Sequence, residues 1–236
     1  MGAIRRVLIP AVLMPSMLLG VGCDDDDEHG VGAHPSAPPL TAAQLTAARL
    51  TAADAPPGFT AAPVTERSDT GSPVTDDRAC QPLLDLAAAF DTHGPGRPLA
   101  DTRLVARPTA GPDVPVAVYL AAYPPGTLDG LVAAARRALP NCHTSTGWSG
   151  GRATRYELTA LPAPAPAGAP PIGDEAFSFL LATHPADMSA ATAGVTVVRA
   201  GSTLVVLTRT DHVGHTAEAP AADLARRQAE RVAAAR

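Results

Sequence analysis

The sequence contains no lysine, and aromatic residues make up only 3% of its 236 residues. All 18 basic residues are therefore arginines. Because large rings are so scarce, alanine and valine must fill much of any hydrophobic core. The composition, rich in alanine and proline and free of lysine, points to a GC-rich genome rather than to a function.

Long apolar runs are also missing after the first twenty-three residues, so no later segment is predicted to span a membrane. The chain starts with Arg5 and Arg6, followed by an apolar run over Val7–Leu19 that Pro10 and Pro15 interrupt. A single transmembrane anchor is the alternative interpretation, but this run is shorter than the ~20 residues a spanning helix needs. The layout is typical of a secretory signal peptide.

The signal ends in a cysteine. Small residues precede Cys23, as in bacterial lipoprotein signals, although Gly20 stands where a leucine is usual and Leu19 lies one place further away. We expect cleavage after Gly22, a lipid on Cys23, and an exported protein held on the outer face of the cell membrane.

The net charge is small outside one short segment. The formal net charge is −5, and five acidic residues stand together at 24–28. The remainder is nearly neutral, which argues against nucleic acid as a partner. The acidic run could bind calcium, but a solvated spacer is the simpler interpretation. We expect a signal peptide over 1–22, a disordered tether over 23–39 and one folded domain over 40–236.

Cysteines are few. With Cys23 lipidated, Cys80 and Cys142 remain, an even number in an oxidising compartment, and we predict that they form a disulfide. A cysteine nucleophile or a metal pair is the alternative. Neither residue has a nearby cysteine at metal-binding spacing, and no cofactor motif occurs, so we expect neither a metal nor a cofactor.

Apolar spacing predicts helices near 41–50, 80–90, 127–139 and 220–236. Thr41 and Gln44 fit a capping box, and Thr127 is the predicted cap of the third helix. The predicted strands are 59–66, 102–108, 115–123, 152–160, 173–181, 195–200 and 203–209. The last two are apolar on both faces and should be central, joined by a turn at 201–202. This pattern predicts an α+β domain, with about four helices on a twisted, mostly antiparallel sheet.

Residues Gly147–Gly151 match the G-x-S-x-G motif of serine hydrolases, with Ser149 as the nucleophile. Asp174 or Asp187 and then His212 follow in the expected order. The motif requires a strand before it and a helix after it, whereas here a helix precedes and a strand follows. A glycine-rich turn beside the disulfide is therefore the favoured interpretation.

Two further groups are weak site candidates. His212 and His215 have metal-ligand spacing beside Asp211, but no third ligand accompanies them, and a solvated loop is favoured. If a ligand groove exists, the large side chains with polar tips should line it; these are Tyr119, Tyr123, Trp148 and Tyr156. Ordinary packing is the alternative for each.

Three segments resemble secreted actinobacterial lipoproteins and the extracellular sensor domain of a mycobacterial receptor serine/threonine kinase. They are Leu50–Phe59, Gly173–Ala176 and Val197–Gly201, the last leading into a valine-rich strand. The resemblance spans about 40–236 and implies an α+β domain with a central antiparallel sheet, a disulfide-stabilised groove and an unidentified ligand. The family's second disulfide has no cysteines here, and no kinase domain follows, so the chain is not expected to signal across a membrane alone.

Together these features predict a lipid-anchored, non-catalytic, sensor-like domain outside the cytoplasm that binds a ligand or an envelope protein. A secreted hydrolase using Ser149 and a structural envelope lipoprotein are the alternatives. A roomy cleft would favour a small molecule, and a flat apolar patch would favour a protein partner.

Overall fold

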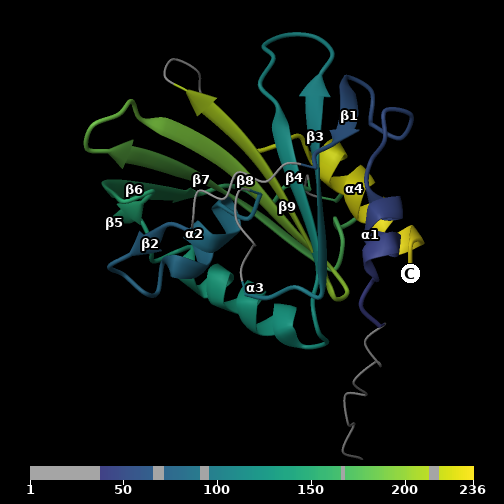
Figure 1. Cartoon of the computed structure of the whole chain (residues 1–236), viewed down its shortest axis with the longest axis horizontal. Helices are drawn as coiled ribbons and strands as arrows, with labels where there is room; N and C mark the ends of the chain where they lie inside the picture. The colour runs from purple at the N-terminus through teal and green to yellow at the C-terminus, as the bar shows by residue number, and fades with distance from the viewer. Residues whose placement is uncertain (1–37, 66–71, 91–95, 166–167, 213–217) are drawn as a thin grey trace, which may run out of the picture. The chain divides into compact units, whose positions relative to one another are not determined.

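A twisted sheet forms the centre of the domain (Figure 1). The computed structural model describes residues 38–65, 72–90, 96–165, 168–212 and 218–236, all within one compact unit spanning Pro35–Arg236. In these residues nine strands pair in the order β1-β3-β4-β9-β8-β7-β6-β5-β2, each antiparallel to its neighbours. The strands are β1 (Phe59–Pro63), β2 (Val74–Thr75), β3 (Ala100–Pro108), β4 (Val116–Ala122), β5 (Thr144–Ser149), β6 (Arg152–Ala160), β7 (Glu175–Pro185), β8 (Ala191–Ala200) and β9 (Thr203–His212).

Helices cover both faces of this sheet. Among the described residues they are α1 (Ala42–Ala48), α2 (Gln81–Ala87), α3 (Thr127–Ala138) and α4 (Ala222–Ala234). Helices α2 and α3 pack on one face, and α1 and α4 pack on the other (Figure 1). The predicted α+β class with four helices is confirmed.

The central strands are buried on both sides. In β9, Leu204 and Val206 belong to the core under α2 and α3, whereas Val205 and Leu207 belong to the core under α1 and α4. This alternation follows from the two-residue period of a strand. Burial on both faces explains why the sequences of β8 and β9 contain continuous apolar runs. The predicted central position of these strands and their pairing as a hairpin are confirmed.

The predicted disulfide is present. Cys80 stands at the start of α2 and Cys142 follows α3, with their Cα atoms 5.6 Å apart and both side chains buried. The bond therefore fixes the start of one helix to the end of the other, on the face where they pack together. Pro82 occupies the first turn of α2, where its missing N–H costs no hydrogen bond.

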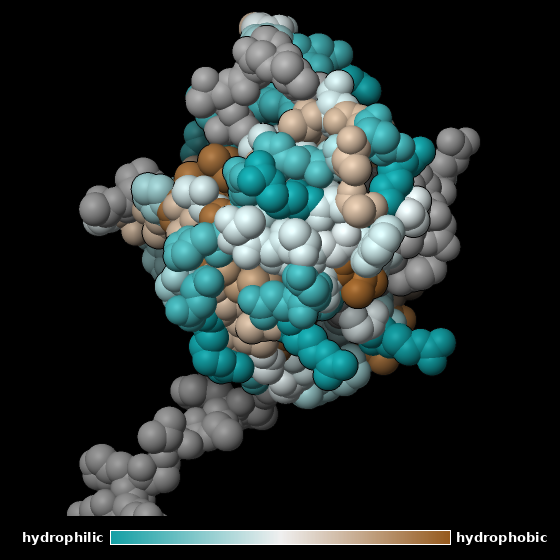
Figure 2. All heavy atoms as spheres, turned by 90° about the vertical axis from the view of Figure 1, so that its left-hand side faces the viewer, coloured by the Kyte–Doolittle hydropathy of each residue, from teal (hydrophilic) through white to brown (hydrophobic). Residues whose placement is uncertain are grey.

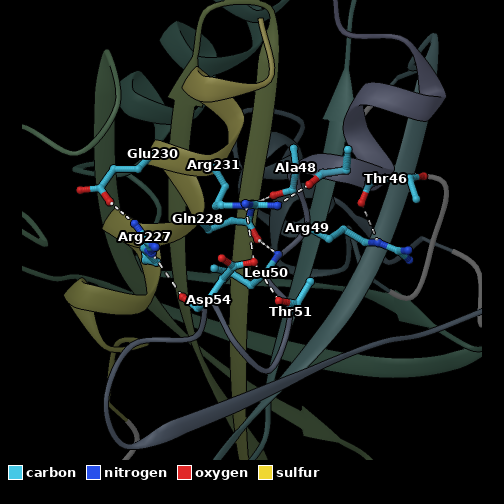
Figure 3. Close-up of polar contacts among 11 residues, drawn as sticks. Thr46, Ala48, Arg49, Leu50, Thr51, Asp54, Arg227, Gln228, Glu230 and Arg231 are labelled. Atoms are coloured by element: carbon cyan, nitrogen blue, oxygen red, sulfur yellow. Dashed lines mark hydrogen bonds and ion pairs between the residues drawn. The ribbon is translucent and has the colours of Figure 1, made fainter.

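Hydrogen bonds between side chains of α4 and the backbone at the end of α1 join these two helices (Figure 3). We call this set of contacts the α1–α4 clasp. The fully buried Gln228 of α4 donates from Nε2 to the carbonyl of Ala48 (2.8 Å) and accepts at Oε1 from the N–H of Leu50 (3.2 Å). Arg231 donates to the carbonyl of Ala47. These contacts satisfy backbone groups that the end of a helix leaves without intrahelical partners.

At its start, α1 has the predicted capping box: Gln44 N–H donates to the Thr41 hydroxyl, and Thr41 N–H donates to the Gln44 side chain. The predicted cap of α3 is wrong. Gly126 holds the N-cap position with a φ of 79°, a left-handed conformation that glycine adopts easily, and Thr127 is the first helical residue.

Two strands were not predicted. Residues 144–149 form β5, and β2 pairs with its last part through Val74 opposite Trp148 and Thr75 opposite Gly147. A Cβ on Gly147 would lie 1.9 Å from the carbonyl oxygen of Val74, so only glycine permits this close approach.

No helix within the described ranges is both long and apolar enough to cross a membrane.

Candidate functional site

A groove lies on the α2 side of the sheet, formed by two adjoining cavities of about 200 and 530 Å³. Both are lined by Ala87, Thr208 and Thr210, and we call the pair the α2 groove. The smaller cavity is further lined by Pro73, Leu84, Ala88, Ser149, Tyr156, Leu181, Thr183, Ala191 and Ala193. The larger is further lined by Phe90, Val105, Asp113, Val114, Pro115, Ala117 and Asp211.

Small side chains create this space. Ala87 and Ala88 stand at the end of the short helix α2, and Ala191 and Ala193 lie on the strand beneath. Methyl groups on both sides of a helix–sheet contact leave room that larger side chains would fill. The shortage of aromatic residues in the composition thus contributes to the open space between α2 and the sheet.

None of the described residues that line the smaller cavity has a charged side chain, and their polar side chains carry hydroxyls. The Tyr156 hydroxyl and Thr208 Oγ1 are buried and have no hydrogen-bond partner among the described residues. Burial raises the pKa of the Tyr156 phenol, and nearby Thr154 and Ser149 offset only part of that rise. Since buried polar groups are nearly always paired, these two hydroxyls without a partner are an unusual feature of the groove wall.

Two acidic residues, Asp113 and Asp211, border the larger cavity, but strand alternation puts the Asp211 side chain on the opposite face of the sheet from Thr208 and Thr210. Asp113 is largely exposed and lies 3.1 Å from Arg107 Nη1. Asp211 is buried, and the Nε atom of Arg209 lies 3.6 Å from its Oδ2. Neither oxygen of Asp211 accepts a hydrogen bond within the described part of the chain.

The four predicted ligand residues do not lie together. Tyr156 lines the smaller cavity, whereas Tyr119 and Tyr123 are fully buried in the core under α2 and α3. The Arg103 guanidinium lies 5.1 Å from the ring centroid of Tyr119. Trp148 is 60% exposed and lines neither cavity. The groove instead uses threonines and alanines of separate strands, which no local motif signals.

The hydrolase motif adopts a different geometry from an esterase elbow. Ser149 ends β5 and lies on the groove wall, but Gly150 and Gly151 then form a turn into β6, so no helix follows the serine. This outcome agrees with the predicted glycine-rich turn, although the strand before it was missed. The motif thus lacks the strand-to-helix turn that exposes such a nucleophile.

The predicted acids of that triad are engaged elsewhere. Asp174 accepts a hydrogen bond from Gly201 N–H, at the opposite end of the β8–β9 hairpin from His212. Asp187 pairs with Arg152 at 3.2 Å on the surface. The side chain of His212 lies outside the described part of the structure.

Cys23 and His215 lie outside the described residues. Within the described ranges, the group of three potential metal ligands is Asp77, Cys80 and Cys142, and its two sulfur atoms form the disulfide.

The surface beside β5 and β6 is mixed. Figure 2 shows apolar residues in small groups among hydrophilic ones on this face, rather than one broad apolar area. Large exposed apolar side chains in the described residues include Val74 and Trp148, which face each other across β2 and β5. A cleft is therefore the more prominent candidate site.

No protein-family model matches this sequence, and no curated protein matches it. Among solved structures, the extracellular domain of PknH from Mycobacterium tuberculosis aligns with a TM-score of 0.52 at 15% identity, covering 83% of this chain and 98% of that domain. Similarity at this level of identity is a similarity of fold. The chain therefore has the fold of this extracellular domain, as the resemblance in its sequence predicted.

Proposed function

We propose that this protein is a non-catalytic ligand-binding domain, exported and held at the membrane by a lipid on Cys23. The α2 groove is the observation that carries the proposal. Its wall combines apolar side chains with buried hydroxyls that have no partner among the described residues. Ligand sites commonly have this composition, with a mainly apolar wall and a few polar groups that orient the ligand.

Three further observations support the proposal. The fold is that of the extracellular domain of PknH. The first twenty-three residues have the layout of a lipoprotein signal. The G-x-S-x-G motif occurs on a hairpin, a context that does not support the alternative of a serine hydrolase.

Binding to the groove can be tested with N-phenyl-1-naphthylamine, a neutral apolar dye that fluoresces in apolar sites. The full chain carrying Cys23→Ser is suitable, because it carries no acyl chain that would compete for the groove. We expect saturable fluorescence, and Thr210→Trp should weaken dye binding about tenfold by filling space that both cavities share.

Thr159→Trp is the matched control. Thr159 is also an exposed strand threonine, but it points to the opposite face of the sheet from Tyr156 and Leu158. The control should bind the dye as the parent chain does. If the dye does not saturate, or both tryptophan variants bind it equally well, the groove is not the binding site.

Lipid anchoring has its own test. Replacing Cys23 with serine should move the protein from the membrane fraction to the medium, because the acylated residue is lost. Palmitate labelling of the wild-type chain and its loss in the variant are the measurements. The double variant Cys80→Ala, Cys142→Ala should keep the label. A Cys23→Ser protein that still sediments with membranes would contradict the anchor.

A further inference from the structure

The floor of the α2 groove is a row of mostly small side chains that continues from strand to strand. Strand register places these side chains directly opposite one another on the α2 side of the sheet. The opposed pairs are Val105 with Ala117, Ala117 with Thr208, Thr210 with Ala193, Ala191 with Thr183, and Thr183 with Tyr156. Each of these residues lines one or both cavities, so the cavities share one continuous floor, which we call the floor track.

The floor track belongs to the part of this face that α2 and α3 leave uncovered. In β4 and β9, Tyr119 and Val206 are fully buried in the core under these helices. Two residues away on the same strands, Ala117 and Thr208 lie on the same face but are only half-buried. Helix α2 ends at Ala87, which lines both cavities. The short helix therefore leaves an open groove that runs across the strands.

The length of the floor track follows from the spacing of the strands. The track crosses the sheet from β3 to β6 in the order β3-β4-β9-β8-β7-β6. Neighbouring strands are ~4.8 Å apart, so the five steps between these strands give a length of ~24 Å. An extended alkyl chain, with C–C bonds of ~1.5 Å in a zigzag, matches this length with about eighteen carbons.

The distribution of charge in the groove complements an amphiphile. Every side chain of the floor track is uncharged. At the end near β3 and β4, Asp113 lines the larger cavity, is 68% exposed, and lies 3.1 Å from Arg107 Nη1. A polar head group can stay hydrated beside this exposed ion pair, while the uncharged track removes an apolar tail from water.

We propose that the α2 groove binds one extended alkyl chain of a lipid, which lies along the floor track from the Asp113 end toward Tyr156. This assignment rests on the proposed binding function and adds the chemical class of the ligand. Methyl groups of alanine, valine and threonine form most of the track, and they contact an alkyl chain without needing a hydrogen bond. A compact ligand would fill one cavity and leave the rest of the track open.

The test uses alkyl maltosides, which share an uncharged sugar head group and differ in the length of the tail. Octyl, dodecyl and hexadecyl maltoside, each below the concentration at which it forms micelles, displace N-phenyl-1-naphthylamine from the full chain carrying Cys23→Ser. We expect affinity to rise about tenfold or more for every four methylenes, since full burial of one methylene is worth about fourfold. The rise should continue to the hexadecyl tail, because the track is long enough to hold it.

Ala117→Leu shortens the track at its β4 position. It should weaken hexadecyl maltoside binding about tenfold and leave octyl maltoside binding unchanged, since the shorter tail still fits between Thr208 and Tyr156. Ala182→Leu is the matched control. Ala182 is also a half-buried strand alanine, but it lies on the opposite face of the sheet from its neighbour Thr183. The control should bind both maltosides as the parent chain does.

Equal affinities of the three maltosides, or a rise that ends at the dodecyl tail, would overturn the alkyl-chain assignment and leave the dye site intact. The same holds if the dye saturates but no maltoside displaces it, or if the two leucine variants behave alike. Failure of the dye itself to saturate would overturn the proposed function as well. Should Ala117→Leu fold poorly, as its melting temperature would reveal, the length series in the parent chain still decides.

Discussion

Removing the disulfide should lower the free energy of unfolding by about 4 kcal/mol, the largest stability effect we expect from a change in this chain. Cys80 and Cys142 are 62 residues apart in sequence, so their bond closes a long loop and restricts the unfolded chain. The suitable variant carries Cys80→Ala and Cys142→Ala in the Cys23→Ser background, which avoids mispaired thiols and keeps the buried positions apolar. Urea unfolding at neutral pH measures the difference.

The same variant should also bind the dye more weakly. The disulfide fixes the start of α2, and the end of α2 forms the wall of the groove through Ala87 and Ala88. Without the bond, α2 is held by its packing on the core and by the hydrogen bonds of Gln81 with Thr75 and Pro73, so its position over the sheet becomes less defined. A loss of stability below about 1 kcal/mol would show that the disulfide contributes little beyond the contacts around it.

Replacing Gln228 with leucine should cost about 3 kcal/mol of unfolding free energy. The change removes two hydrogen bonds and leaves the carbonyl of Ala48 and the N–H of Leu50 buried without partners, each at about 1–3 kcal/mol. Leucine has a similar volume and helix propensity, so the loss would report the hydrogen bonds rather than packing. Chemical denaturation of the parent and variant chains is the measurement.

Arg227→Ala is the control for this prediction. Arg227 lies next to Gln228 on α4 and also donates to a backbone carbonyl, that of Asp54, but its side chain is 46% exposed. Its loss should change stability by less than about 1 kcal/mol. Equal effects of the two substitutions would mean that burial of Gln228 has no special importance.

Gln228→Glu gives a pH-dependent version of the same test. A protonated glutamic acid could still donate to Ala48 and accept from Leu50, whereas burial of the charged form is unfavourable and raises the folded-state pKa. Stability from the neutral form is fully present below the unfolded pKa of about 4.3 and is lost as pH rises through the folded pKa. The deficit relative to the parent chain should therefore be smallest at acidic pH and largest near pH 7.

The fold could be predicted where local signals agreed with packing. The apolar runs around Val197 and Val205 indicated central strands because both of their faces are buried. The strand β5 was missed because its sequence, Thr-Ser-Thr-Gly-Trp-Ser, has no alternation of apolar and polar residues. The strand also lies near the edge of the sheet, where only two residues of β2 pair with it. Such a strand is specified by its neighbours rather than by its own residues.

The groove was harder to predict than the fold. Its wall joins Thr208 of β9, Tyr156 of β6 and Ala87 of α2, which are far apart in sequence and share no motif. Four aromatic residues were predicted to line a groove because their side chains are large and end in polar groups. Three of the four lie instead in the core or on the surface. Whether a side chain lines a cavity depends on what is missing opposite it, and a single sequence does not contain that information.

The α1–α4 clasp has a consequence for biogenesis. Its hydrogen bonds join residues 178 to 184 positions apart, so the backbone groups at the end of α1 remain without these partners until α4 has been synthesised. Such late closure keeps the nascent polypeptide from completing its native structure early. The export that we propose would require the chain to pass through a secretion channel unfolded, and this delay would favour that passage.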